Sequence, residues 1–167
     1  MAPHYRISHY VLTTCCMLID VALNACAAQC TFEQMLIEGG CHCGAVRYRI
    51  DGEPKTHTLC HCTDCRRHAG APMVGWMMFA VEDVNVTKGK PKVYASSEHG
   101  RRHFCGDCGT GILYFNANIL PGIVDVQSAT LDDPDFIPAR NHIQTAERIT
   151  WIKTAHELPE FERYPQK

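Results

Sequence analysis

The clearest periodic pattern in the chain begins at residue 46. In Val46–Ile50, apolar and charged residues alternate with period two, which is typical of a strand that buries one face. Short segments rich in apolar residues follow it along the chain. Together they predict strands over Val46–Ile50, Met73–Ala80, Val84–Thr87, Lys92–Ser96, Gly111–Phe115, Ile123–Gln127 and Thr150–Lys153.

Turn signals separate several of these segments, at Lys88-Gly89-Lys90-Pro91, Pro121-Gly122 and Asp132-Asp133-Pro134. A long helical period is missing after residue 38, and only a short helical turn is expected around Cys62–Ala69. We find no internal repeat and no low-complexity linker. The pattern therefore predicts one mainly β domain of short antiparallel strands over residues 38–167.

Residues 1–37 have a different character. Val11–Ala28 is largely apolar, but Asp20 and Asn24 interrupt it, and it is shorter than the roughly 20 residues that a membrane span needs. A signal peptide ending near Ala25-Cys26-Ala27 is one alternative. A natural start at Met35 is another.

Export would expose clustered thiols to oxidation, which argues against the signal-peptide alternative. We therefore expect a cytoplasmic protein whose residues 1–37 form a poorly specified extension. Its four cysteines are given no role in metal binding: Cys15, Cys16, Cys26 and Cys30.

Composition narrows the classes of function. The chain has 167 residues with 46% hydrophobic residues, which suits one domain with a hydrophobic core. A formal net charge of −2 and the absence of a basic run argue against nucleic acid as the main partner. Eleven cysteines are an odd number, and C-x-C and C-x-x-C spacings favour metal binding over structural disulfides, which remain the lesser alternative.

Two cysteine pairs indicate a structural metal site. In an extended segment, Cys41 and Cys43 would point to one side and His42 to the other. Cys105-Gly106-Asp107-Cys108-Gly109 has the form of a zinc knuckle, in which glycines permit a tight turn with positive φ. Structural zinc takes four ligands, so the economical assignment joins Cys41, Cys43, Cys105 and Cys108 around one ion that stabilises the domain.

Three cysteines remain for a second ion: Cys60, Cys62 and Cys65. The same alternation places Cys60 and Cys62 together, and the chain must turn to bring Cys65 to them. Three thiolates leave the fourth position of zinc for water or an incoming thiolate, as in catalytic sites. The alternative is that His68 or another side chain completes the tetrahedron and this site is structural too.

Basic residues near these cysteines suggest the kind of ligand. Zinc with three thiolates has a net charge of about −1, so an anionic ligand needs compensation. Arg66 and Arg67 follow Cys65 directly, and Arg101-Arg102-His103 precedes the knuckle. In a common cleft they would ease thiolate binding and hold carboxylates. The alternative is that most are solvated surface residues.

Three blocks of this sequence carry a family resemblance. They are Gly39–Tyr48, Cys60–Arg66 and Phe104–Thr110, and they resemble the signature blocks of the glutathione-dependent formaldehyde-activating enzyme family, which shares its domain with centromere protein V. The similarity extends from about Gly39 to Phe161. Its closing part includes Leu131–Pro134, His142, Trp151 and Leu158–Phe161.

The resemblance implies a β-rich fold often called a β-tent, with two zinc ions per chain. In the family the two outer cysteine pairs hold a structural zinc, and the central triple holds a zinc regarded as catalytic. The implied activity adds formaldehyde to glutathione to give S-hydroxymethylglutathione, and the reverse cleavage is that of a carbon–sulfur lyase. Zinc would bind the glutathione thiolate or polarise the aldehyde oxygen. Arg66 and Arg67 become candidate contacts of glutathione.

A shared fold does not assign a substrate, and three functions follow from these observations. The first is a zinc-dependent lyase acting on a small thiol–carbonyl adduct, with glutathione and formaldehyde as the leading pair. The second is a non-catalytic zinc module that binds a protein or chromatin partner. The third is a redox sensor that uses Cys60, Cys62 and Cys65. Iron or another thiophilic metal in place of zinc also stays open.

Overall fold

The protein is described here from a computed structural model, which covers residues 36–165. Strand β1 starts at Leu36, and Ile37 is buried in the core. Nearly all of the predicted extension over residues 1–37, with its four cysteines, lies outside the described residues. The boundary at residue 38 therefore stays a prediction.

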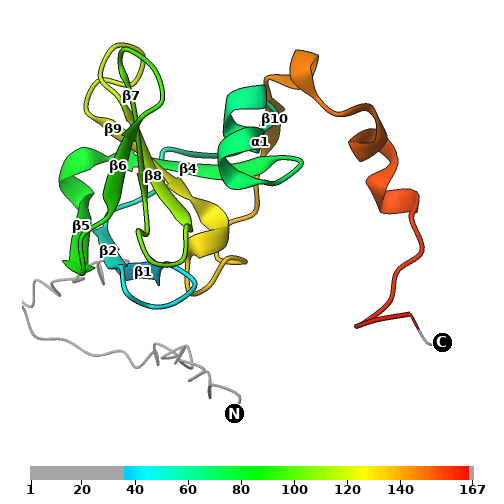
Figure 1. The fold of residues 1–167 in the computed structure, drawn as a ribbon, viewed down its shortest axis with the longest axis horizontal. Coiled ribbons are helices and arrows are strands. Elements are labelled where there is room, and N and C mark those ends of the chain that lie inside the picture. Colours follow the sequence, from blue (N-terminus) through cyan, green and yellow to red (C-terminus); the bar gives the residue numbers. More distant parts are fainter. Residues whose placement is uncertain (1–35, 166–167) are drawn as a thin grey trace, which may run out of the picture. The chain divides into compact units, whose positions relative to one another are not determined.

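Two sheets make up the described part of the chain (Figure 1). The smaller one has the order β1-β2-β5 and is antiparallel, from β1 (Leu36–Gly40), β2 (Arg47–Asp51) and β5 (Val84–Lys88). The larger one has the order β10-β3-β4-β9-β8-β7-β6, and β10 runs parallel to β3 while all other pairs are antiparallel. Its strands are β3 (Thr56–Cys60), β4 (Val74–Ala80), β6 (Lys92–Ala95), β7 (Gly100–Phe104), β8 (Gly111–Asn116), β9 (Ile123–Gln127) and β10 (Asn141–Ile143).

Helical segments are short. The α-helix α1 spans Thr63–Ala69, and the expected helical turn around Cys62–Ala69 is therefore confirmed. The 3-10 helices are η1 (Val81–Asp83), η2 (Ser128–Thr130), η3 (Thr145–Glu147) and η4 (Thr150–Glu157). The fold is mainly β with antiparallel sheets, as the sequence predicts.

One predicted strand is wrong. Thr150–Lys153 begins the 3-10 helix η4, while the other six predicted segments form β2, β4, β5, β6, β8 and β9. Trp151 is 57% exposed, and the Thr154 hydroxyl donates to the Trp151 carbonyl at 3.3 Å. Four residues with two apolar side chains are too short a pattern to separate a strand from a helical turn.

Four strands were not predicted: β1, β3, β7 and β10. In β3, His57 and Thr58 are consecutive and both buried, so the strand shows no alternation. In β7, the charged Arg102 is buried where the pattern leads one to expect an apolar residue. Both strands are held by neighbours on each side, and pairing of this kind is decided by tertiary contacts rather than by local sequence.

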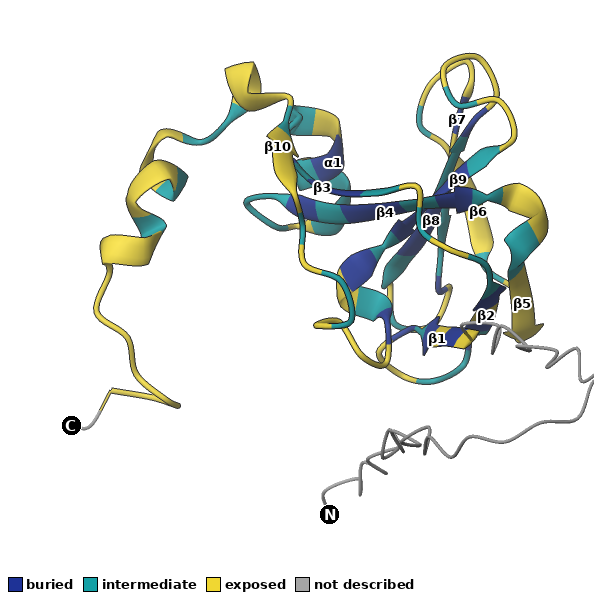
Figure 2. Cartoon of the chain, turned by 180° about the vertical axis from the view of Figure 1, so that it is seen from behind, coloured by how far each residue is buried: buried dark blue, intermediate teal, exposed yellow. Residues whose placement is uncertain are grey.

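The hydrophobic core lies between the two sheets. Tyr48 and Ile50 of β2 pack in one buried cluster with Met77 and Phe79 of β4 and Val124 of β9. Figure 2 shows the corresponding dark blue stretches of β4, β8 and β9, in contrast to the largely exposed residues near the C-terminus. Strand alternation thus directs one face of the larger sheet toward the smaller one.

The Tyr48 ring packs closely against Gly39 and connects the smaller sheet to Thr130. A Cβ atom at this position would overlap the Tyr48 ring and would lie 2.6 Å from the Thr130 carbonyl oxygen. The Tyr48 hydroxyl forms a hydrogen bond with Oγ1 of Thr130 at 2.7 Å. Only glycine leaves room for the tyrosine ring here, which gives a physical reason for one glycine of the Gly39-Gly40 pair.

Phe79→Ala is expected to lower the free energy of unfolding by about 3 to 5 kcal/mol, because its fully buried ring would leave a cavity between the sheets. Denaturant unfolding followed by circular dichroism measures this loss. Val93→Ala in β6 is the control, since Val93 is 55% exposed and its change should be within about 0.5 kcal/mol. Equal losses in both variants would contradict the placement of the core.

Candidate metal centres

Cys41 and Cys43 lie in a turn between β1 and β2 rather than in an extended segment, and this corrects the sequence-based expectation. The Gly44 amide donates to the Cys41 carbonyl at 3.0 Å, and Gly44 has a φ of 72°. The two sulfur atoms nevertheless lie 3.6 Å apart. The Val46 amide donates to Sγ of Cys41 at 3.2 Å, which favours the thiolate form.

Cys105 and Cys108 lie in a second turn, between β7 and β8. The Gly109 amide donates to the Cys105 carbonyl at 3.0 Å. Gly109 has a φ of 79°, and no atom lies within 4 Å of an added Cβ, so conformation rather than space requires glycine here. The expected knuckle turn is present.

The two turns meet. Sγ of Cys43 and Sγ of Cys105 are 3.8 Å apart, and the His42 amide donates to Oγ1 of Thr110 at 3.2 Å. Hydrogen bonds from Thr110 lower the pKa of the Cys108 thiol to about 5, and the hydroxyl of Thr110 has a larger effect than its backbone amide. All four sulfur atoms lie within 4.8 Å of one another: Cys41, Cys43, Cys105 and Cys108.

A second group of sulfur atoms lies at the end of β3. Cys60 is the last residue of β3, Cys62 is the N-cap of α1, and Cys65 lies in the first turn of this helix. The Cys65 amide donates to Sγ of Cys62 at 3.2 Å. These three sulfur atoms also lie within 4.8 Å of one another. Because Cys62 precedes a helix, capping brings Cys65 back to it, which strand alternation alone does not explain.

No fourth His, Cys, Asp or Glu ligand joins this second group among residues 36–165. His68, the candidate for a fourth ligand, packs edge-on against Phe104 with ring centroids 6.4 Å apart. Each group of sulfur atoms is close enough to hold a metal ion. The candidate ligand sets are thus four cysteines in one group and three in the other.

Arg102 contacts the three-cysteine group from β7. Its Nη2 lies 3.6 Å from Sγ of Cys65 and donates to Oδ2 of Asp64, and its guanidinium lies 4.7 Å from the centre of the Tyr114 ring. Arg102 is only 1% exposed. The sequence shows Arg102 within the run Arg101-Arg102-His103 but does not indicate which of the two arginines contacts the cysteines. Arg101 points to the opposite face of β7.

Four hydrogen-bonding contacts explain why Cys65 favours the thiolate. Hydrogen bonds from Cys60 and Cys62, followed by those from Arg102 and Trp76, lower the pKa of the Cys65 thiol to about 5, although burial raises it. The same contacts leave Cys60 as the thiol that keeps its proton longest, since its pKa is raised by Cys65 and by burial. A sulfur cluster that ionises readily at one member suits a thiophilic metal.

The face of the larger sheet that carries this group combines the apolar Val74 and Trp76 with buried polar side chains. Cross-strand pairs place Arg102, Tyr114 and Asp125 side by side on β7, β8 and β9. Burial, followed by the negative charge of Cys65, raises the pKa of Asp125 to about 7. Several buried polar atoms on this face have no hydrogen-bond partner: Thr58 Oγ1, Arg102 Nε and Nη1, Asp125 Oδ1 and Gln127 Nε2. Buried polar groups seldom stay unpaired, so this face is suited to water or a polar ligand.

His61 lies between two of the cysteines in the sequence, and its side chain turns away from them toward His142. It is 1% exposed, and its Nε2 forms a hydrogen bond with Nδ1 of His142 at 2.9 Å. Burial, followed by the charge of Arg148, lowers the pKa of His61. Its amide donates to the Ile143 carbonyl at 3.0 Å, which ties the cysteine loop to β10.

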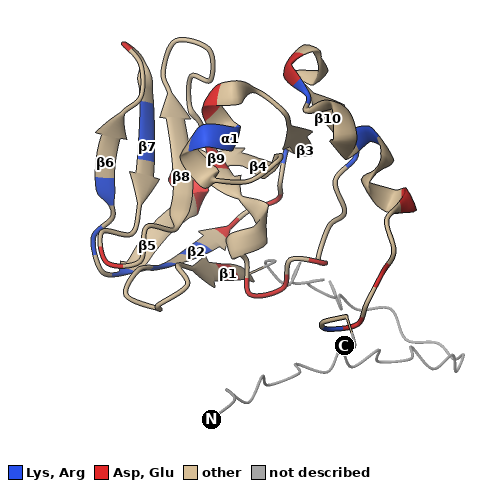
Figure 3. Cartoon of the chain, turned by 45° about the vertical axis from the view of Figure 1, so that its right-hand side comes forward, with Lys and Arg blue, Asp and Glu red and all other residues tan. Residues whose placement is uncertain are grey.

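Arg66 and Arg67 lie on α1, where Figure 3 shows basic residues on the helix. Arg66 is already engaged: Nε donates to the His61 carbonyl at 3.0 Å, and Nη2 donates to Oγ1 of Thr63 and to the Glu147 carbonyl. Arg67 is exposed. Their role as contacts of glutathione stays a prediction.

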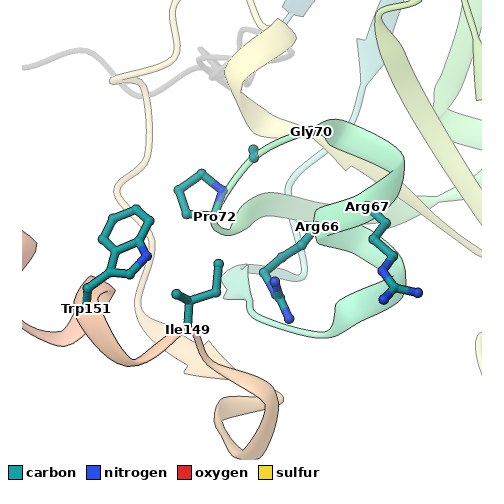
Figure 4. Close-up of a pocket in the computed structure, with 7 residues that line it drawn as sticks. Arg66, Arg67, Gly70, Pro72, Ile149 and Trp151 are labelled. Carbon is teal, nitrogen blue, oxygen red and sulfur yellow. The ribbon is translucent and has the colours of Figure 1, made fainter.

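Both arginines line a cavity of about 240 Å³ together with Gly70, Ala71, Pro72, Ile149 and Trp151. Figure 4 shows Trp151, Ile149 and Pro72 near one another, whereas the guanidinium of Arg67 points away from Trp151. The wall opposite α1 is therefore apolar.

Within residues 36–165, no helix is long and apolar enough to cross a membrane.

The fold and the two sulfur clusters define a mainly β protein with two candidate metal centres. Residues 36–147 match the glutathione-dependent formaldehyde-activating enzyme family, and the chain belongs to this family. The resemblance noted in the sequence is confirmed.

The chain is also similar to individual proteins. A Halomonas elongata protein whose name assigns it to this family is 29% identical over 128 residues, which are 71% of this chain and 81% of that protein. A Schizosaccharomyces pombe protein named as an uncharacterized lyase is 34% identical over 114 residues, or 59% of this chain and 81% of that protein. A crystal structure of a Rhodobacter sphaeroides protein has a TM-score of 0.49 and 22% identity, covering 63% of this chain and 98% of that one.

Arg102→Met is expected to raise the pKa of Cys65 in the metal-free protein, because it removes a positive charge 3.6 Å from the sulfur. The present pKa of about 5 lies below that of an unfolded thiol, so the thiolate contributes stability at high pH and loses it as the pH falls through about 5. In the variant this loss should occur at higher pH. Thiolate ultraviolet absorbance and the alkylation rate of Cys65, each measured against pH, give the pKa.

Arg101→Met is the matched control, since Arg101 donates to the carbonyls of Ser97, Glu98 and Gly100 and does not contact the cysteines. Its thiol titration should equal that of the parent chain. An unchanged titration in Arg102→Met as well would show that Arg102 does not influence Cys65.

Proposed function

We propose that this chain is a zinc-dependent carbon–sulfur lyase that forms and cleaves the adduct of a small thiol and an aldehyde. The leading pair is glutathione and formaldehyde, with S-hydroxymethylglutathione as the adduct. The family name and the lyase name of the S. pombe relative support this reaction class. The observation that carries the proposal is the three-cysteine group, which has no fourth His, Cys, Asp or Glu ligand among residues 36–165.

The two sulfur clusters suit different roles. Four cysteines from two turns, 62 positions apart at Cys43 and Cys105, provide the full ligand set of a structural zinc and would tie the β1–β2 turn to the β7–β8 turn. Three cysteines provide an incomplete set. When bound there, zinc would supply a Lewis acid and a position for a thiolate or a carbonyl oxygen.

Formation of the thiol–aldehyde adduct changes one C–S bond and the position of one proton. The thiol sulfur adds to the carbonyl carbon and forms the C–S bond, and the thiol proton goes to the carbonyl oxygen. The reverse reaction breaks the C–S bond and returns the proton to sulfur. The protein therefore needs to favour the thiolate and to limit access of water, rather than to form a covalent intermediate.

Residues around the three cysteines serve these needs. Arg102 Nη2 lies against Sγ of Cys65 and offsets part of the negative charge of a thiolate cluster, which lowers the cost of bringing in another thiolate. Trp76 and Val74 pack beside Cys60 and Cys65 and limit the access of water to them. Asp64 holds Nη2 of Arg102, which fixes the guanidinium in place.

Cys62→Ser is expected to reduce the zinc content from about two ions to about one while the β circular dichroism is retained. Cys105→Ser should unfold the domain, because it removes a ligand that is buried in the main core. Metal analysis and circular dichroism of the purified variants test both outcomes. Cys26→Ser, in the extension that is given no metal role, is the control and should keep both ions.

Turnover tests the reaction class. The zinc-loaded chain should accelerate formation of S-hydroxymethylglutathione from glutathione and formaldehyde, observed by nuclear magnetic resonance exchange, and Cys62→Ser should lose this acceleration. Other thiols and aldehydes should be compared under the same conditions. A folded chain with two zinc ions that accelerates none of these reactions would instead support a zinc module that binds a partner.

A further inference from the structure

A cavity of about 340 Å³ lies on the side of the cysteine loop toward which His61 turns. We call it the His61 cavity, and its lining residues are His61, Met73, His142, Arg148, Ile152, Lys153, Ala155 and His156. Five of these eight side chains carry nitrogen, and none is acidic. The volume is in the range of small-molecule sites.

The positive charge of this cavity is not compensated. Arg148 and Lys153 form no ion pair among the described residues, and Nε of Arg148 is buried without a hydrogen-bond partner. Among the described residues, the ion pair made by a lining side chain is that of His156 with Glu157 at 3.8 Å, and both of these side chains are exposed. Figure 3 shows Lys and Arg at several points along the chain that follows β10.

The buried His61 side chain in this cavity also has an unpaired nitrogen atom. His61 is 1% exposed, and its Nδ1 has no hydrogen-bond partner although Nε2 is bound to His142. Unpaired buried polar atoms of this kind cost free energy unless a ligand or water meets them. Arg148, with its unpaired Nε donor, and Lys153 therefore favour an oxygen-rich anion in this cavity. Nδ1 of His61 is a further donor when Nε2 accepts its hydrogen bond from Nδ1 of His142.

We propose that the His61 cavity binds the oxyanion of a small ligand, a carboxylate or a phosphate, through Arg148 and Lys153. Arginine offers a planar fork that matches both groups, and lysine adds a second positive charge. Met73, Ile152 and Ala155 provide apolar contacts for the remainder of the ligand.

Two kinds of ligand could carry this oxyanion. His61 lies between Cys60 and Cys62, so the cavity and the three-cysteine group share one loop. A thiol substrate that carries carboxylates, such as the glutathione of the proposed function, could use the cavity for one of them. A free phosphate-bearing molecule is the other source, and it does not depend on the proposed function.

Calorimetric titration of the zinc-loaded full chain at low ionic strength distinguishes these sources. The two probes are S-methylglutathione, which keeps the carboxylates but has no free thiol, and inorganic phosphate. Saturable binding of either probe is expected, and Arg148→Met or Lys153→Met should weaken it about tenfold. Binding of S-methylglutathione alone assigns the cavity to the substrate, and binding of phosphate alone assigns it to a separate anion.

Control variants separate charge from folding. Arg148→Lys should retain more affinity than Arg148→Met, and Arg163→Met, which changes an exposed arginine outside the cavity, should bind like the parent chain. Zinc content and circular dichroism must be unchanged in each variant. No saturable binding of either probe, or equal affinities in Arg148→Met, Lys153→Met and the parent chain, would overturn the inference.

The two proposals fail in different ways. If the chain shows no turnover but binds phosphate in an Arg148-dependent manner, the anion site stands and the proposed reaction does not. If the chain shows turnover but the affinity for both probes is unchanged in the Arg148 and Lys153 variants, the proposed reaction is supported and the anion site is not.

Discussion

The two faces of the seven-stranded sheet are the constraint on which the rest of this structure depends. Side chains alternate across a strand, so β4, β8 and β9 cannot present apolar residues to the smaller sheet without presenting the intervening residues to the other side. Met77, Phe79 and Val124 fill the core, and Arg102 and Asp125 necessarily occupy the opposite face. The three-cysteine group lies on that face, where Val74 and Trp76 pack beside it.

Charge then decides what this face can do. Cysteine sulfur atoms that cluster within 4.8 Å repel one another when ionised, and a metal ion or a neighbouring cation is needed to hold them as thiolates. Arg102 supplies such a cation in a buried position, where its interaction with sulfur is weakly screened. A buried cation and an incomplete sulfur ligand set together favour binding of a further thiolate.

The loop of Cys60, His61 and Cys62 connects two chemically different environments. Its sulfur atoms gather with Sγ of Cys65 on α1, whereas its imidazole contacts His142 of β10 and lines a cavity with residues of the 3-10 helix η4. The His61 amide is held by the Ile143 carbonyl, so β10 positions the loop through its backbone. A ligand that carries both a thiol and an oxyanion would find complementary groups on the two sides of one short loop.

Sequence alone determined the cysteine grouping and most of the central strands, because C-x-C and C-x-x-C spacings and period-two alternation are local properties. It missed β3 and β7, whose buried His57, Thr58 and Arg102 carry no alternating pattern, and it mistook the first turn of η4 for a strand. Only the tertiary structure selected Arg102 over its neighbours as the contact of Cys65 and brought His61, Arg148 and Lys153 into one cavity. These contacts join residues far apart in the chain, and the pairing of strands that creates them is set by packing across the whole domain.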